Sequence, residues 1–167
     1  HRIEHNSCCT MKQLKRLKKL GVIPSSSIGY MYGLGAQYAE NFGPERVRWL
    51  HPHKTMKEMG IIAGGNSDCP VTFYRPFVQM YTAVTRKSSS GQVVGPEEAI
   101  SVMDAIRVYT INGAYLSKEE AIKGSIEPGK LADMIVLDRD ITTIPSDKIK
   151  DVKVLKTFVG GKIVYSK

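Results

Sequence analysis

Short apolar segments alternate with helical patterns over the first two thirds of the chain, and this alternation restricts the possible folds more than any other feature. Residues 2–5 and 21–25 predict short strands on either side of a helical segment, residues 11–20. The continuous apolar run of residues 61–65 is typical of a strand buried in a parallel sheet. Strands that alternate with helices in this way predict an α/β fold with crossover helices.

The boundaries of the helices are marked by local signals. Thr10 and Gln13 have the spacing of a capping box at the start of the first helix, and Gly21 is suited to end it in a left-handed conformation. Three further helices are expected, at residues 54–59, at residues 78–86 and, as a longer helix, from Pro96 onward.

Residues 28–50 are rich in glycine and aromatic residues and show no sustained period, which predicts a long loop. Loops of this length in compact domains are usually functional or disordered. The aromatic content favours a functional loop, because solvated linkers are poor in aromatic residues. We therefore expect this loop to shape a binding pocket for a small-molecule substrate.

The pattern changes after Leu116. Residues 129–137 predict a turn and a strand, and residues 154–159 can pair with residues 162–165 across Gly160-Gly161. A Gly-Gly connection of two residues is a strong hairpin signal. The chain is thus expected to end in a small antiparallel β unit.

Composition places the chain among ordinary globular proteins, with 42% hydrophobic and 24% charged residues in 167. No stretch approaches the ~20 apolar residues of a membrane span, and the first residues lack the layout of a secretion signal. The three cysteines, Cys8, Cys9 and Cys69, make a poor disulfide framework and fit a reducing compartment. We expect a soluble, cytoplasmic protein, and the absence of an initial Met predicts that an upstream portion is missing.

The formal net charge is +8, and much of the excess lies in one predicted helix. The basic residues of that helix are Lys12, Lys15, Arg16, Lys18 and Lys19. They share the segment with an apolar stripe at Met11, Leu14 and Leu17, which is typical of a surface helix with a solvated basic face. Nucleic-acid binding through this face is a less favoured alternative.

Two polar residues stand where strands of the predicted sheet end, His5 and Asp68. Active sites of parallel barrels gather at this end of the strands, because the loops there converge. Either residue alone also has an explanation without function. A histidine near a strand end is often a structural hydrogen-bonding group, and Asp68 could cap the turn before Pro70.

Five motifs occur in the order seen in the amidohydrolase superfamily, at residues 2–5, 66–71, 83–86, 109–114 and 124–133. The chain resembles amidohydrolase family 3 most, a branch in which some members carry the label exoenzyme regulatory protein. The last motif is common to many amidohydrolases, whereas the first two in combination point to this branch.

The resemblance implies a fold and a division of the chain. Residues 1–123 would form strands six to eight of a TIM-type (β/α)₈ barrel with their helices. Residues 124–167 would form part of the small composite β-sandwich that amidohydrolases build from both chain termini. A complete barrel takes ~250 residues, so three strands cannot close it and would leave sheet edges unpaired.

The resemblance also implies roles for individual residues. His5 matches the histidine that ligates a divalent metal, usually zinc, at the end of the sixth strand. Asp68 matches the aspartate at the end of the eighth strand, which contacts the metal and takes a proton from the water bound to it. The implied activity is metal-dependent hydrolysis of amide-type carbon–nitrogen bonds. Beside the predicted loop, Arg46 could bind an acidic part of the substrate, although solvated loop arginines are common.

The remaining ligands of the family lie upstream of the region that this chain matches. Two ligands are too few for a catalytic zinc, which typically has three protein ligands and an open position. We expect the chain to be inactive alone, and to need either the missing part of the barrel or another chain over its open sheet edges. The alternative is a non-catalytic regulatory or interaction module that reuses the fold.

His51-Pro52-His53 imitates the missing His-x-His motif, but Pro52 interrupts it and the segment leads into a predicted helix. We therefore expect these histidines at the surface or at the helix entry. Gly33-x-Gly35 follows no clear strand, so a nucleotide site there is not favoured. Tyr109 and Asn112 are expected to pack the barrel segment against the β unit.

Overall fold

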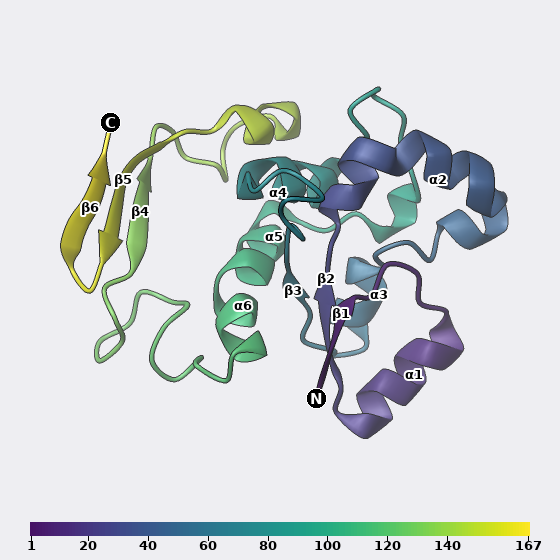
Figure 1. Ribbon diagram of the computed structural model, residues 1–167, viewed down its shortest axis with the longest axis horizontal. Helices are drawn as coiled ribbons and strands as arrows, with labels where there is room; N and C mark the ends of the chain where they lie inside the picture. Colours follow the sequence, from purple (N-terminus) through teal and green to yellow (C-terminus); the bar gives the residue numbers. More distant parts are fainter.

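The computed structural model describes residues 1–167 and contains two small sheets (Figure 1). The first sheet is parallel, with β1 (Arg2–His5), β2 (Ile23–Ser26) and β3 (Gly64–Gly65) in that order. The second is antiparallel, with β4 (Met134–Leu137), β5 (Val154–Val159) and β6 (Lys162–Ser166). The predicted parallel sheet and the C-terminal hairpin are both present. The assignment of the parallel strands to positions six to eight of a barrel, and the domain boundary at residue 123, stay predictions.

The register of the parallel sheet aligns the carboxyl ends of its strands. His5 lies opposite Ser26, and Ser26 lies opposite Gly65. Loops that leave these three positions therefore start at the same edge of the sheet. This edge carries the candidate site described below.

Helix α1 (Met11–Leu20) connects β1 to β2 and begins as predicted. The backbone N–H of Thr10 donates to Gln13 Oε1 at 2.9 Å, and Gly21 ends the helix at φ 61°. Leu14 is fully buried in a small cluster with Met56 and Ile61, while the five basic residues of the helix are exposed. The basic face is therefore solvated, as expected.

The predicted loop at residues 28–50 is wrong, because most of it forms helix α2 (Gly29–Val47). Gly43 breaks the helix with φ 70° and ψ 168°. The helix is held by packing rather than by an amphipathic pattern: a Cβ on Gly35 would lie 2.9 Å from Ser88 Cβ. Because glycines occupy positions of close contact in this helix, its sequence lacks the helical repeat of apolar residues on which the prediction depended.

The remaining helices are α3 (His53–Glu58), α4 (Pro76–Thr85), α5 (Val102–Tyr109) and α6 (Ile111–Leu116), with 3₁₀ turns at Pro96–Glu98 and Ser146–Asp151. The single long helix expected from Pro96 is wrong. Ser101 starts a new helix, since its hydroxyl accepts the Asp104 N–H at 3.1 Å, and Thr110 separates α5 from α6 with non-helical angles of φ −126° and ψ −94°. A favourable N-cap inside the segment decides where the helix begins.

Only the last two residues of the apolar run at 61–65 pair as a strand. Both are glycines against which α5 and α6 pack closely. A Cβ on Gly64 would lie 2.8 Å from Leu116 Cγ, and a Cβ on Gly65 would lie 2.8 Å from the Tyr109 hydroxyl. The two glycines therefore let the helices lie directly on the strand.

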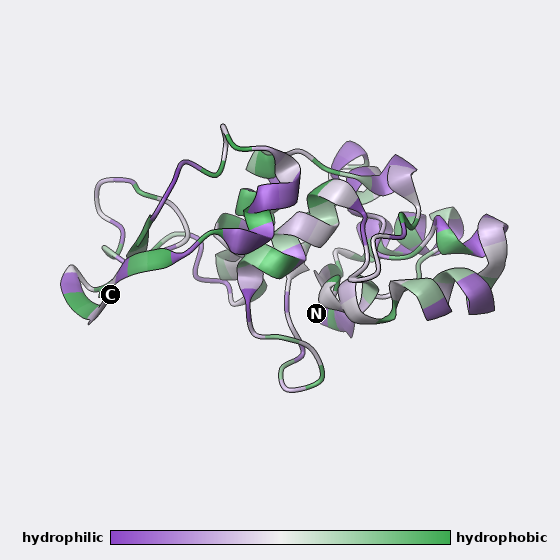
Figure 2. Ribbon diagram, turned by 90° about the horizontal axis from the view of Figure 1, so that it is seen from above, coloured by the Kyte–Doolittle hydropathy of each residue, from purple (hydrophilic) through white to green (hydrophobic).

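The main hydrophobic core joins α2, α4 and α5 to the segment that follows β4. Ile141, Ile149 and Val152 of that segment are buried in the same cluster as Phe77 and Met80 of α4. In Figure 2, apolar residues recur on the central helices and on the strands of the second sheet. All five residues of β6 are exposed, including Val164 at 61%. No helix is long and apolar enough to cross a membrane.

Candidate active site

The carboxyl-terminal edge of the parallel sheet brings His5 and Asp68 together. His5 ends β1, Asp68 follows β3 by three residues, and His5 Nε2 lies 3.8 Å from Asp68 Oδ1. The histidine side chain is 50% exposed and the aspartate side chain is 30% exposed, so both remain open to solvent. Two residues 63 positions apart in the sequence thus meet at one edge.

The backbone at both residues is in a sparsely populated conformation. His5 has φ 67° and Asp68 has φ 48°, although neither is a glycine. Such values are uncommon outside glycine and concentrate at functional sites, where the surrounding structure holds them in place.

Tyr30 is a third member of the site. It lies in the first turn of α2, and its hydroxyl donates a short hydrogen bond to Asp68 Oδ2. Its ring meets the His5 ring edge-on, with centroids 6.0 Å apart and planes at 72°. The hydrogen bond to Asp68, aided by burial, raises the pKa of Tyr30 to about 12, so the phenol is a neutral donor at physiological pH.

A row of polar side chains fixes the backbone between β3 and Asp68. Asn66 Nδ2 donates to Ser25 Oγ at 2.7 Å, and Ser27 Oγ donates to Asn66 Oδ1 at 2.6 Å. Beside them, burial of Glu4 is outweighed by hydrogen bonds from Ser25 and Arg2, which hold its pKa below the usual range. The turn that carries Asp68 is therefore anchored to the neighbouring strand β2.

The separation of His5 and Asp68 is close to that of two ligands of one ion. Zinc ligands at bond lengths of about 2.0–2.2 Å and a tetrahedral angle lie about 3.3–3.5 Å apart. The observed separation of 3.8 Å is a few tenths of an ångström longer, and the hydrogen bond from Tyr30 leaves Oδ1 facing the imidazole. Residues 1–167 contain no group of three or more His, Cys, Asp or Glu side chains that could hold a metal ion.

The prediction of surface positions for His51 and His53 is wrong, because they are only 0% and 4% exposed. The prediction of a helix entry is confirmed for His53, the first residue of α3. Ser26 Oγ lies 2.8 Å from His51 Nδ1. Burial lowers the pKa of His51 well below its usual value and lowers the pKa of His53 to about 3. Both rings are therefore neutral at physiological pH.

A fully buried arginine explains why this segment turns inward. Arg86 donates to the carbonyl oxygens of Leu50, His51 and Val94 at 2.7, 3.1 and 3.0 Å. Burial lowers the pKa of Arg86 to about 10, although Glu98 and Glu97 oppose the shift. The sequence contains no local signal for a contact between residues 35 positions apart.

Arg46 and Asn112 form their hydrogen bonds with residues other than His5 and Asp68. Arg46 is exposed on α2, and its Nε donates to the carbonyl oxygen of Phe42 at 3.1 Å, so its role in substrate binding stays a prediction. Asn112 Nδ2 donates to the carbonyl oxygen of Ala63 at 2.9 Å and ties α6 to the segment before β3. Tyr109 lines a cavity of about 520 Å³ that also includes residues of β4 and β5, such as Met134 and Phe158.

The chain matches both a family profile and individual known proteins. Residues 1–165 match the profile of a family described as the amidohydrolase family. An N-substituted formamide deformylase from Arthrobacter pascens is 33% identical over 167 residues, which is 99% of this chain and 31% of that protein.

Solved structures share the fold of this chain. An uncharacterized metal-dependent hydrolase from Pyrococcus horikoshii OT3 superposes with a TM-score of 0.75 at 29% identity, covering 87% of this chain and 30% of that one. An adenosine deaminase from Xanthomonas campestris with bound zinc shares the fold with a TM-score of 0.70 at 15% identity, covering 99% of this chain and 37% of that one. The chain spans about a third of the length of these proteins.

Proposed function

Since the chain belongs to the amidohydrolase family, we propose that it supplies part of the active site of a metal-dependent hydrolase of amide-type carbon–nitrogen bonds. The observation that carries the proposal is the 3.8 Å approach of His5 Nε2 to Asp68 Oδ1 at the carboxyl-terminal edge of the sheet. The name of the deformylase relative supports N-substituted amides as the substrate class.

His5 and Asp68 would hold a divalent ion, with zinc the best match to an imidazole and a carboxylate donor. The other ligands would come from further barrel strands, supplied by another part of the polypeptide or by another chain. When bound, such an ion supplies a lowered pKa for water and polarisation of the substrate carbonyl.

The residues of this chain would then perform the proton transfer. Asp68 is open to solvent and can accept a proton from the attacking water and return it to the leaving nitrogen. Tyr30 holds Oδ2 of the same carboxylate, so the second oxygen keeps a fixed orientation toward His5. Asn66 holds the turn in place from the side of β2.

The test is hydrolysis of N-benzylformamide by the polypeptide that contains these residues together with the further ligands. With zinc supplied, Asp68→Asn should lower kcat by roughly a hundredfold or more, because general acid–base catalysis contributes factors of 10² to 10⁴. Amine release measures the rate, and Glu40→Gln, an exposed change on α2, is the matched control. Equal loss in both variants, or full activity without a divalent ion, would contradict the proposal.

A non-catalytic interaction module is the second candidate, and the unpaired edges of the parallel sheet favour it. It predicts binding to a partner chain through the unpaired edges at β1 and β3, with no hydrolysis in any metal-loaded preparation. Amine release by the zinc-supplied polypeptide decides between the two candidates. The three free cysteines support a reducing, cytoplasmic location under either one.

A further inference from the structure

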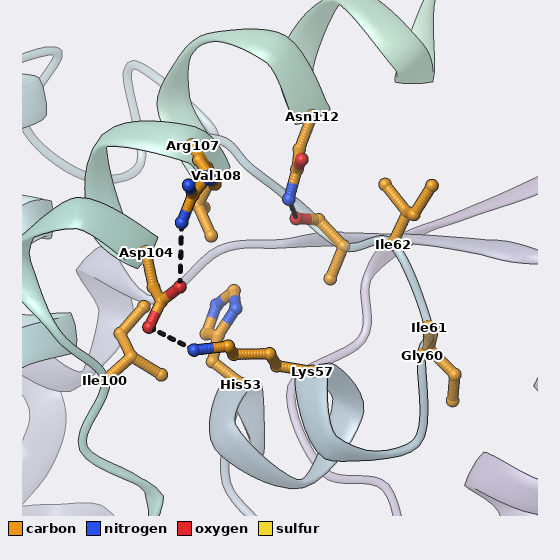
Figure 3. Close-up of a pocket in the computed structure, with 11 residues that line it drawn as sticks. His53, Lys57, Gly60, Ile61, Ile62, Ile100, Asp104, Arg107, Val108 and Asn112 are labelled. Carbon is orange, nitrogen blue, oxygen red and sulfur yellow. Dashed lines mark hydrogen bonds and ion pairs between the residues drawn. The ribbon is translucent and has the colours of Figure 1, made fainter.

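A cavity of about 240 Å³ lies at the opposite end of β3 from Asp68 (Figure 3). It is lined by α3, by α5 and the start of α6, and by the segment that enters β3, and it opens to solvent. We call it the basal cavity and define it by four polar residues, His53, Lys57, Asp104 and Arg107, and two apolar ones, Ile61 and Val108. It contains none of His5, Tyr30 and Asp68.

An unpartnered imidazole faces this space. His53 is 4% exposed, its Nε2 has no hydrogen-bond partner, and Figure 3 shows the ring rising from α3 toward the space between the labelled side chains. Buried polar atoms in native structures are nearly always satisfied, so an orphan next to a cavity indicates a missing partner.

The charges around the cavity favour an anion. Asp104 Oδ2 accepts from Lys57 Nζ at 2.7 Å and from Ser101 Oγ at 2.6 Å, while Oδ1 lies 3.5 Å from Arg107 Nη1. Two cations therefore share one carboxylate, which leaves one net positive charge. An ammonium carries three donors and a guanidinium carries five, so Lys57 and Arg107 keep donors that Asp104 does not use.

Apart from Asn112, the rest of the wall is apolar, which favours a small ligand with a short hydrocarbon part. Ile61 and Val108 line the cavity, and they are 8% and 6% exposed. A multiply charged group such as phosphate would lose hydration against these side chains without a matching charge. A single negative charge matches the one cation in excess.

We propose that the basal cavity binds a short-chain monocarboxylate, with its carboxylate between Lys57 and Arg107 and its aliphatic chain against Ile61 and Val108. The orphan nitrogen of His53 borders the same volume and provides a further polar contact. The proposal is independent of catalysis at the His5–Asp68 edge.

The experiment is an NMR titration of the ¹⁵N-labelled 167-residue chain with butyrate. Saturable shifts of the Gly60 amide and the Asn112 side-chain amide, both at the cavity, are the expected result. Lys57→Gln and Arg107→Gln should each weaken binding at least tenfold, and Lys57→Arg should retain it. Arg16→Gln, an exposed charge on α1, is the matched control.

Butylamine and inorganic phosphate separate the proposed chemistry from simple charge attraction. Butylamine should produce no saturable shift, and phosphate should bind more weakly than butyrate. Lys57 and Arg107 have side chains that are 61% and 59% exposed, so the substitutions leave the core intact, and a thermal melt checks this. No saturable shift with butyrate, binding that survives both Gln variants, or phosphate binding as tight as butyrate binding would each overturn the proposal.

Discussion

At the residue scale, the hydroxyl of Tyr30 donates its hydrogen bond to a carboxylate rather than to water. A hydrogen bond to a charged acceptor is roughly twice as strong as one between neutral groups. One oxygen of Asp68 is therefore held in place before any substrate arrives. The other oxygen stays free on the side of His5, where the chemistry is proposed.

Tyr30→Phe removes this bond and keeps the ring. We expect kcat for N-benzylformamide to fall roughly tenfold with little change in KM, since about 1.4 kcal/mol of transition-state stabilisation corresponds to a factor of ten. Tyr38→Phe is the control, because that tyrosine lies on the same helix and packs on Phe42. An unchanged kcat would show that Asp68 is held without the phenol.

The buried His53 predicts a specific pH dependence of stability. Its pKa is lowered to about 3 in the folded chain, below the ordinary value of about 6.5 expected after unfolding. Between these values the unfolded chain binds the extra proton, so the stabilisation present above pH 6.5 is lost as the pH falls toward 3. The slope should be roughly 1 kcal/mol per pH unit.

Urea unfolding between pH 6.5 and 4.5 measures this slope, and His53→Gln should reduce it. His5→Gln replaces a half-exposed histidine and serves as the control. Equal slopes in the native chain and in His53→Gln would contradict the assignment.

At the element scale, the glycines of β3 allow two helices to lie on the strand. Gly65→Ala would place a Cβ 2.8 Å from the Tyr109 hydroxyl and closer still to the ring. We expect a loss of about 1–3 kcal/mol in the free energy of unfolding, as for other overpacked sites.

The matched change is Gly33→Ala, which has open space around its Cβ in α2. It should leave stability unchanged or raise it by up to about 1 kcal/mol, because alanine favours the helix. Chemical denaturation compares the two variants. A Gly65→Ala chain as stable as Gly33→Ala would show that Tyr109 can move away.

How far the elements could be predicted depended on whether their signals were local. The capping box of Thr10 and Gln13 lies within four residues, and it was confirmed. Helix α2 has no such signal, because its glycines serve contacts with Ser88 and its neighbours rather than a helical period. Because helix α2 was not predicted, Tyr30 was not recognised as part of the candidate site. The strand ends at His5 and Asp68 were recognised from their motifs.

At the scale of the whole molecule, the burial of His51 shows the limit of sequence reasoning. Its position depends on hydrogen bonds from Arg86, 35 residues away, to the backbone at Leu50 and His51. Pro52 and the helix that follows it were interpreted correctly, but they do not indicate whether His51 is buried. Burial is decided by the packed chain and not by the motif.

The exposed β6 strand predicts self-association of the isolated chain. Ile163, Val164 and Tyr165 are 55%, 61% and 48% exposed on an edge strand, and such edges pair with other chains. Val164→Lys should shift the chain toward monomer in sedimentation velocity, because an edge lysine blocks pairing. Lys150→Gln, outside the strand, should not. Monomeric behaviour of the unmodified chain at every concentration would refute the prediction.

The break at Gly43 divides α2 into two parts. The inner part begins beside Tyr30 and is anchored by the buried Met31 and Gly35, whereas the outer part ends on an exposed surface. Because the helix is interrupted at Gly43, a change in length after this residue would leave the Tyr30–Asp68 hydrogen bond in place.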